Sequence, residues 1–271
     1  MTPSDDAAPR STAEASPSGA NSGARQTPQL LPLSLGLVAA ARKLSSTHGT
    51  RFDRAYYTEK AFKGLWDRVW QRDNYTCRFC GFRSRDHQEV HPLDNDHSSK
   101  GQTLENLVTT CSLCHQCYHL DTVSTSSGGK IVLMPEFSQI ELNHLARSLF
   151  VAQDTIERMT KEAEGGDIDQ GYMRQTRVLE DLILERARAL EQHLGQGSSD
   201  PAFFGMALLS LSPEDYSTRE RFIRDIRLMP SRARFVVQTR YHALKAWDQL
   251  PMASWISIAP GDAAGLATTH D

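Results

Sequence analysis

"CRFCGF" at residues 77–82 and "CSLCHQC" at residues 111–117 contain all five cysteines of the 271-residue chain. Each stretch holds a Cys-x2-Cys pair, a spacing typical of a tight turn whose two sulfur atoms converge on one metal ion. Two such pairs complete a tetrahedral set of thiolates around Zn2+ and leave no ligand position for water. The pattern therefore predicts a structural Zn2+ site whose ligands are Cys77, Cys80, Cys111 and Cys114.

The residues beside the second pair leave one alternative open. Cys117 follows Cys114 by three residues. It is interpreted as a thiol that does not bind the metal. The second interpretation is that Cys117 serves as an alternative ligand. His115 is the immediate neighbour of Cys114. Because successive side chains on a helix diverge by about 100°, His115 is expected to point away from the same ion.

The composition of the chain limits which functions are expected. The formal net charge of -3, with 39% hydrophobic and 23% charged residues, is ordinary for a globular protein and gives no global reason to expect nucleic acid as a partner. Residues 218–246 carry eight Arg or Lys against two acidic residues, which predicts either a solvated helical face or a docking surface for an acidic partner. The apolar run "LLPLSLGLVAA" at 30–40 is too short to span a bilayer, and clustered cysteines indicate a reducing compartment.

Changes in composition along the chain predict four segments. Residues 1–28 are rich in Ser, Ala, Pro and Gly and are expected to form a disordered tail. Residues 29–160 are expected to form a zinc-centred α+β domain with flanking helices. The acidic, glycine-containing stretch 161–170 is the best internal break. A helical C-terminal part at 171–250 and a flexible tail at 252–271 complete the predicted organisation.

Local signals place the secondary structure around the cysteines. A short strand is expected within "TSSGGKIVLMP" at 125–135. Ser138 and Glu141 form a capping box at the start of a helix, and Asp200 is expected to cap a further helix. Another helix is expected to run from Pro213 to about Leu228. The predicted fold class is therefore α+β.

The segment between the two cysteine pairs resembles a nuclease core. "QEVHPLDNDHSSKGQTLENLVTTCSLCH" at 88–115 is similar to HNH-type nucleases, in which a zinc-stabilised hairpin and helix present a histidine base, an asparagine and a metal-binding histidine. The resemblance implies an HNH-like treble-clef unit, a short hairpin plus helix, surrounded and followed by α-helices. Asn106 and His115 match the second and third letters of that motif.

The first letter of the motif is where this chain departs from the nuclease pattern. His91 occupies the accessory position, and Pro92 stands where the general base is expected. Proline has no ring nitrogen that can take a proton, so the sequence favours a protein without catalytic activity. A metal-dependent DNA nuclease, with His91, Asn106 and His115 at its site and possible use in conjugative transfer, is the alternative.

A wider resemblance covers roughly residues 30–250. The strings that carry it are "WQRDNYTCRFCGF", "NLVTTCSLCHQCYHL", "LMPEFSQIELNHLARSLF", "SDPAFFG" and "IRLMPSRARF". They are similar to the IcmJ/DotN family of type IVB (Dot/Icm) secretion systems. This resemblance implies a non-enzymatic cytoplasmic adaptor, peripheral at the inner membrane, that binds the C-terminal extension of a DotL-like coupling ATPase and other coupling-complex subunits to support effector export. Nucleic acid is not an expected partner, and membrane contact is expected only through partners.

Overall fold

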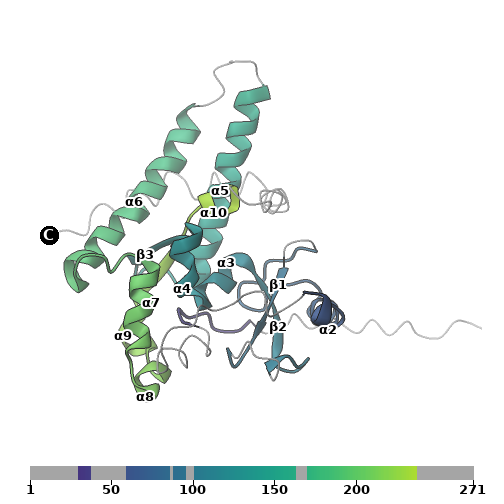
Figure 1. Cartoon of the computed structure of the whole chain (residues 1–271). Coiled ribbons are helices and arrows are strands. Elements are labelled where there is room, and N and C mark those ends of the chain that lie inside the picture. The colour runs from purple at the N-terminus through teal and green to yellow at the C-terminus, as the bar shows by residue number, and fades with distance from the viewer. Residues whose placement is uncertain (1–29, 38–58, 86–87, 96–100, 163–169, 237–271) are drawn as a thin grey trace, which may run out of the picture.

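The structure is a computed structural model with helices and small sheets, which confirms the predicted α+β class (Figure 1). It describes residues 30–37, 59–85, 88–95, 101–162 and 170–236. The predicted tails at 1–28 and 252–271 lie outside these residues. Among the described residues, no helix is both long enough and apolar enough to span a membrane.

The described residues form helices, 3-10 turns and short strands. In chain order they are α2 (Glu59–Arg72), β1 (Gln88–Pro92), β2 (Leu107–Cys111), α3 (Ser112–His115), the 3-10 turn η3 (Gln116–Tyr118), α4 (Leu120–Val123), the 3-10 turn η4 (Ser124–Ser126), β3 (Gly129–Leu133), α5 (Gln139–Glu162), α6 (Gln170–Leu194), α7 (Pro201–Leu209), α8 (Pro213–Ser217), α9 (Glu220–Ile223), β4 (Ile226–Pro230) and α10 (Ala233–Val236).

The cysteine region is built on a two-stranded hairpin. Strands β1 and β2 pair antiparallel, with His91 opposite Val108 and Pro92 opposite Leu107. All five residues of β2 are buried, and α3 begins directly after Cys111. The hairpin therefore delivers the second cysteine pair to a buried junction between a strand and a helix.

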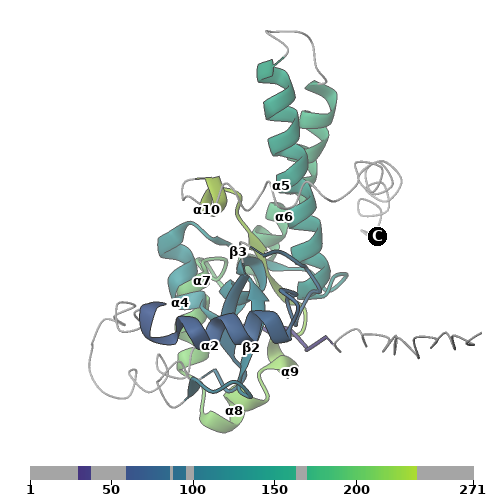
Figure 2. The ribbon, with the colours of Figure 1, turned by 90° about the vertical axis from the view of Figure 1, so that its right-hand side faces the viewer.

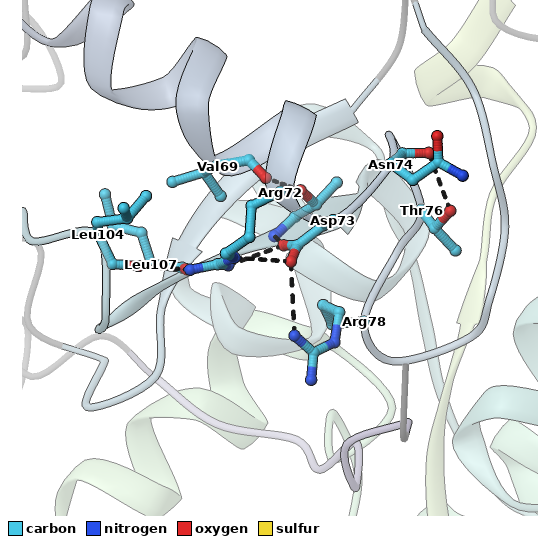
Figure 3. A network of polar contacts seen from close by, with 9 residues as sticks. Val69, Arg72, Asp73, Asn74, Thr76, Arg78, Leu104 and Leu107 are labelled. Carbon is cyan, nitrogen blue, oxygen red and sulfur yellow. Dashed lines mark hydrogen bonds and ion pairs between the residues drawn. The ribbon is translucent and has the colours of Figure 1, made fainter. Parts of the chain in front are cut away.

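Asp73 joins α2 to this hairpin (Figure 3). Its carboxylate is almost fully buried and accepts hydrogen bonds from the Arg72 guanidinium at 2.9 Å and from the Thr109 backbone NH at 2.8 Å. Arg72 also donates to the carbonyl oxygen of Leu107, and Arg78 contacts the same carboxylate at 3.5 Å. These contacts fix the end of α2 against β2 and against the turn that holds the first cysteine pair.

The prediction of a helix that reaches about Leu228 is wrong at its C-terminal end, because those residues belong to the second sheet. Residues Ile226–Pro230 form strand β4, which pairs antiparallel with β3 and places Leu228 opposite Ile131. Both side chains are fully buried, so pairing with β3 outweighs the local helical preference. A Cβ at Gly129 would lie 2.3 Å from the carbonyl oxygen of Met229, and only glycine allows this approach of the two strands.

The two parts of the chain that flank the predicted internal break share this sheet. Strand β3 precedes residue 160 and β4 follows residue 171, and α5 and α6 pack against the paired strands. Helices α5 and α6 lie side by side and extend beyond both sheets in the two views (Figures 1 and 2). The predicted boundaries stay a prediction, but the parts on either side of the break are packed together.

The predicted helix starts at Ser138 and Asp200 are confirmed. The Ser138 NH donates to the Glu141 carboxylate at 2.7 Å, and the Glu141 NH donates to the Ser138 hydroxyl at 3.2 Å, which is a reciprocal capping box. The Asp200 carboxylate accepts from two backbone NH groups in the first turn of α7. Local capping chemistry therefore sets where α5 and α7 begin.

Two buried clusters form the core. The first surrounds the four cysteines of the Cys-x2-Cys pairs and includes Leu142 and Phe150 of α5. The second contains Leu37, Leu120 and Tyr216. The extended segment 30–37 runs along both clusters and is held by backbone hydrogen bonds to Arg78 and Cys117. The cysteine unit is thus enclosed by parts of the chain that precede it and by parts that follow it.

Candidate metal centre

The first cysteine pair lies in a tight turn between α2 and β1. The Cys77 NH donates to the carbonyl oxygen of Phe82 at 2.8 Å, and the Gly81 NH donates to the carbonyl oxygen of Cys77 at 2.9 Å. Gly81 adopts a φ of 75°, a backbone conformation that glycine reaches at no steric cost. This turn folds the chain back on itself and brings the side chains of Cys77 and Cys80 to the same interior point.

The second pair meets the first there. Cys111 ends β2 and Cys114 lies on α3, and the four sulfur atoms lie within 4.8 Å of one another. The Sγ atoms of Cys80 and Cys111 are 3.6 Å apart, close to the roughly 3.8 Å between two thiolates on a tetrahedral Zn2+ and far beyond the roughly 2.05 Å of a disulfide. All four side chains are buried. These cysteines can hold a structural metal ion.

Helix α5 adds two polar side chains to the cluster. Nη2 of Arg147 lies 3.3 Å from the Cys111 sulfur and 3.6 Å from the Cys80 sulfur, and Nδ2 of Asn143 lies 3.5 Å from the Cys114 sulfur. The Cys-x2-Cys spacing does not point to these residues. The signal in the sequence is a polar pair four residues apart on the apolar face of a predicted helix, a position where polar side chains usually have a buried partner.

The electrostatics of the cluster fit a bound cation. Burial raises the pKa of the Cys111 and Cys114 thiols well above the ordinary value, whereas hydrogen bonding to the Cys111 sulfur lowers the pKa of Cys80 well below it. Burial alone would lower the pKa of Arg147, but negative charge on the neighbouring Cys111 and Cys80 sulfurs, when they are ionised, raises it. Four ionised sulfurs need more positive charge than one guanidinium supplies, and a divalent metal ion provides it.

Cys117 lies outside this group of four. Its thiol packs in the second buried cluster and contacts the carbonyl oxygen of Leu113 at 3.4 Å. Burial raises the pKa of Cys117 to about 12, so the side chain stays a neutral thiol. The position of Cys117 favours the interpretation that it does not bind the metal.

The structure brings together two of the three residues in the alternative nuclease site. The rings of His91 and His115 lie 5.2 Å apart between centroids, and His115 belongs to a different side-chain group from Cys114, as expected for neighbours on a helix. Asn106 does not join them. Its amide donates to the Asp94 carboxylate at 2.9 Å and to the carbonyl oxygen of Gly101 at 2.8 Å, and thereby closes the loop between β1 and β2.

Comparison with known proteins identifies a relative that aligns with most of the chain. No family model matches it. The "Type 4 apparatus protein DotN" of Legionella pneumophila subsp. pneumophila (strain Philadelphia 1) is 33% identical over 211 residues, which cover 77% of this chain and 92% of the relative. An identity of this level over nearly all of the relative extends far beyond the cysteine pairs. The chain therefore belongs to the IcmJ/DotN family of type IVB (Dot/Icm) secretion systems.

Proposed function

We propose that this chain is a non-enzymatic, zinc-stabilised adaptor of a type IVB secretion coupling complex. In this proposal it binds the C-terminal extension of the coupling ATPase, together with other subunits, and supports effector export. The observation that carries the proposal is the relationship to the type 4 apparatus protein DotN, which spans 92% of that relative. In the same proposal the adaptor acts in the cytoplasm and lies at the inner membrane only through its partners.

Zn2+ has a stabilising role in this proposal. Cys77, Cys80, Cys111 and Cys114 would hold the ion, and the four thiolates would leave no position for a reacting water molecule. The β1–β2 hairpin followed by α3 supports an HNH-like treble-clef unit around that ion. Such an ion contributes folding free energy to the unit that carries the surrounding helices.

Exposed apolar side chains on α7 support partner binding. Phe203 and Met206 are 52% and 65% exposed, and they share one face of α7 because they lie three residues apart. Phe204, the next residue after Phe203, is buried in the core. Helix α7 therefore has one apolar face toward the core and another toward the surface. Neighbouring exposed apolar side chains of this size are typical of a surface that another protein covers.

The nuclease alternative has less support from the geometry. Pro92 ends β1 opposite Leu107, and the Asn106 side chain is bound within its own loop. His97 follows His91 as the next histidine in the sequence and is a further candidate for the base of such a nuclease, and it lies outside the described residues. The ring contact between His91 and His115 is the observation for which the metal-dependent nuclease is tested as well.

The test is a binding assay and a cleavage assay on one sample. The purified, zinc-loaded protein is mixed with the C-terminal extension of the coupling ATPase from the same genome and run on gel filtration. A second portion is incubated with plasmid DNA and Mg2+. A stable complex without cleavage is the expected result. Cleavage that is lost in His115→Ala, together with no complex, would establish the nuclease instead.

A further inference from the structure

Helix α6 carries an exposed apolar pair on the side that faces away from the core. Val178 and Leu182 are 51% and 45% exposed, and they lie on one face of the helix because they are four residues apart. The side chains that α6 buries, Ile183, Ala187 and Leu190, belong to the two core clusters and lie on another face. The fold therefore covers one apolar face of α6 and leaves this apolar pair exposed.

The exposed face stands clear of the sheets over much of its length. Helices α5 and α6 extend beyond both sheets in the two views (Figures 1 and 2). The side chains of α6 that the structure shows as buried all lie in its C-terminal half, where the helix packs against β3. A second helix can therefore approach Val178 and the N-terminal half of α6 without meeting either sheet.

The charged side chains that flank the apolar pair change sign along the helix. Arg174 and Arg177 form a basic group on the N-terminal side of the pair, and both are exposed. Asp181 and Glu185 form an acidic group further along the same side of the helix, and both are exposed as well. Within the part of the chain that the structure describes, Arg174, Arg177 and Asp181 form no ion pair. Glu185 pairs with the exposed Arg188 at 2.7 Å, so most of these charges are available to a second molecule.

The order of these groups favours one arrangement of two copies of the chain. When two α6 helices lie antiparallel about a twofold axis level with residue 180, Val178 of each helix lies opposite Leu182 of the other, because both are two residues from the axis. The basic group of each helix then lies within about 3 Å, measured along the helix axis, of the level of the other copy's acidic group. A parallel pair would instead place the two basic groups side by side, where like charges repel.

We propose that the chain forms a reversible homodimer in which α6 of each copy packs antiparallel against α6 of the other, through the apolar pair and the two charged groups. A single exposed apolar residue is ordinary on a protein surface, but an apolar pair between charges of opposite sign is complementary to a second copy of itself. Because both sheets lie toward the C-terminal end of α6, the bodies of the two copies lie at opposite ends of the helix pair (Figure 1). Self-association through α6 does not require that the chain acts as an adaptor.

The size of the contact sets the expected affinity. Two α6 helices centred on residue 180 overlap from residue 170 to residue 190, which is about 30 Å of helix. For a helix about 10 Å wide, the contact covers about 300 Å² on each copy, which is less than the roughly 800 Å² per partner of a standard interface. We therefore expect a dissociation constant between about 10 and 100 µM, so that the dimer separates on dilution.

Analytical ultracentrifugation of the full-length, zinc-loaded protein tests the proposal. The protein is measured from about 1 µM to about 500 µM, and its mass should rise from that of a monomer to that of a dimer. Val178→Ser/Leu182→Ser should weaken the association at least tenfold, because the apolar centre of the contact is lost. Leu194→Ser is the matched control, because it changes an apolar side chain of 55% exposure on the same helix but beyond the overlap. That control should associate as the unmodified protein does.

Two charge-reversal variants test the antiparallel arrangement. In the first, Arg174→Glu/Arg177→Glu, the basic group becomes acidic, and in the second, Asp181→Lys/Glu185→Lys, the acidic group becomes basic. Each variant alone brings like charges together and should stay monomeric over the same concentrations. An equimolar mixture restores opposite charges at both ends of the contact, so a heterodimer should form with an affinity within about threefold of that of the unmodified protein. Damage to the fold of either variant would not be repaired by mixing.

Three results would overturn the proposal. The first is an unmodified protein that stays monomeric at every concentration. The second is a dimer that the apolar and charge-reversal variants retain, which would place the contact on another surface. The third is a mixture of the two charge-reversal variants that stays monomeric, which would exclude the antiparallel pair. Binding of the ATPase extension is measured separately on the same variants, so the failure of either proposal is seen independently of the other.

Discussion

Nη2 of Arg147 lies 3.3 Å from Sγ of Cys111, which places a buried cation from the middle of α5 directly against the candidate metal centre. The Arg147 guanidinium also lies over the ring of Phe82 at 4.1 Å, and the residue is 1% exposed. A buried guanidinium is stable only beside negative charge or well-placed acceptors. The contact of Arg147 with the sulfur atoms of Cys80 and Cys111 therefore also helps to hold α5 in place.

Arg147→Met tests this relationship. Methionine keeps much of the volume of the side chain but removes the charge next to the sulfurs, so we expect the zinc-loaded protein to lose about 3 kcal/mol of unfolding free energy. Arg186→Met is the control, because Arg186 forms a partly exposed ion pair with Glu136 and should cost about 1 kcal/mol or less. Urea unfolding of both variants measures the difference. Equal losses would show that Arg147 has no special link to the cysteine cluster.

The cysteine assignment predicts a clear contrast between the four clustered cysteines and Cys117. Cys111→Ser and Cys77→Ser each remove one of four clustered sulfurs, so we expect loss of the bound zinc and of soluble folded protein. Cys117→Ala removes a buried thiol outside the group and should keep its zinc, with a stability loss of about 1 kcal/mol from the small cavity. Zinc content and melting temperature are measured for all three. Normal zinc content in Cys111→Ser would disprove the four-cysteine site.

The hydrogen-bonded carboxylate of Asp73 should make the stability of the protein depend on pH in a particular way. Burial alone would raise the pKa of Asp73, but hydrogen bonds from Arg72 and from the Thr109 NH hold it below its ordinary value of 3.8. A lowered pKa in the folded state means that this stabilisation is present above the unfolded value and is lost as the pH falls through the folded value. We expect Asp73→Asn to cost about 2 kcal/mol at neutral pH and progressively less below about pH 4.

Unfolding of both proteins at each pH checks this prediction. Loss of zinc at low pH affects the unmodified protein and Asp73→Asn alike, so the difference between their unfolding free energies isolates Asp73. A difference that stays constant between pH 7 and pH 3 would show that Asp73 acts only through its shape.

Substitution of Asn106 distinguishes a contact that closes a loop from a catalytic role. Because its amide is bound to Asp94 and Gly101, Asn106→Ala should loosen the connection between β1 and β2 and cost about 1 kcal/mol of stability. We expect zinc binding and binding of the ATPase extension to be unchanged. Loss of secretion in cells with unchanged stability and binding would mean that Asn106 has a functional role beyond the loop.

The cysteine site could be predicted from the sequence because its signal is local. Each Cys-x2-Cys pair specifies its own turn, so Cys77 and Cys80 required no knowledge of the rest of the chain. The starts of α5 and α7 were predictable for the same reason, since capping depends on residues within one turn.

The remaining features depend on contacts between distant residues. The sequence of strand β4 by itself predicts a helix. It forms a strand because it pairs with β3, which lies almost one hundred residues earlier in the chain. Arg147 reaches the cysteine cluster only because α5 packs across the cysteines. Likewise, the contact between Glu89 and His115 joins a strand and a helix whose docking no local pattern describes.

The apolar face of α7 provides the last prediction. The double variant Phe203→Ser/Met206→Ser removes two exposed side chains from one face of this helix and should leave the unfolding free energy nearly unchanged, because neither side chain belongs to the two buried clusters. If this face binds the ATPase extension, the affinity should fall at least tenfold, as is usual when large anchors are lost from an interface. Leu194→Ser, which changes an apolar side chain of 55% exposure at the end of α6, is the matched control. Calorimetric titration that gives the same weakening in both variants would place the binding surface elsewhere. Weakening confined to the α7 variant would identify α7 as the face that binds the ATPase extension.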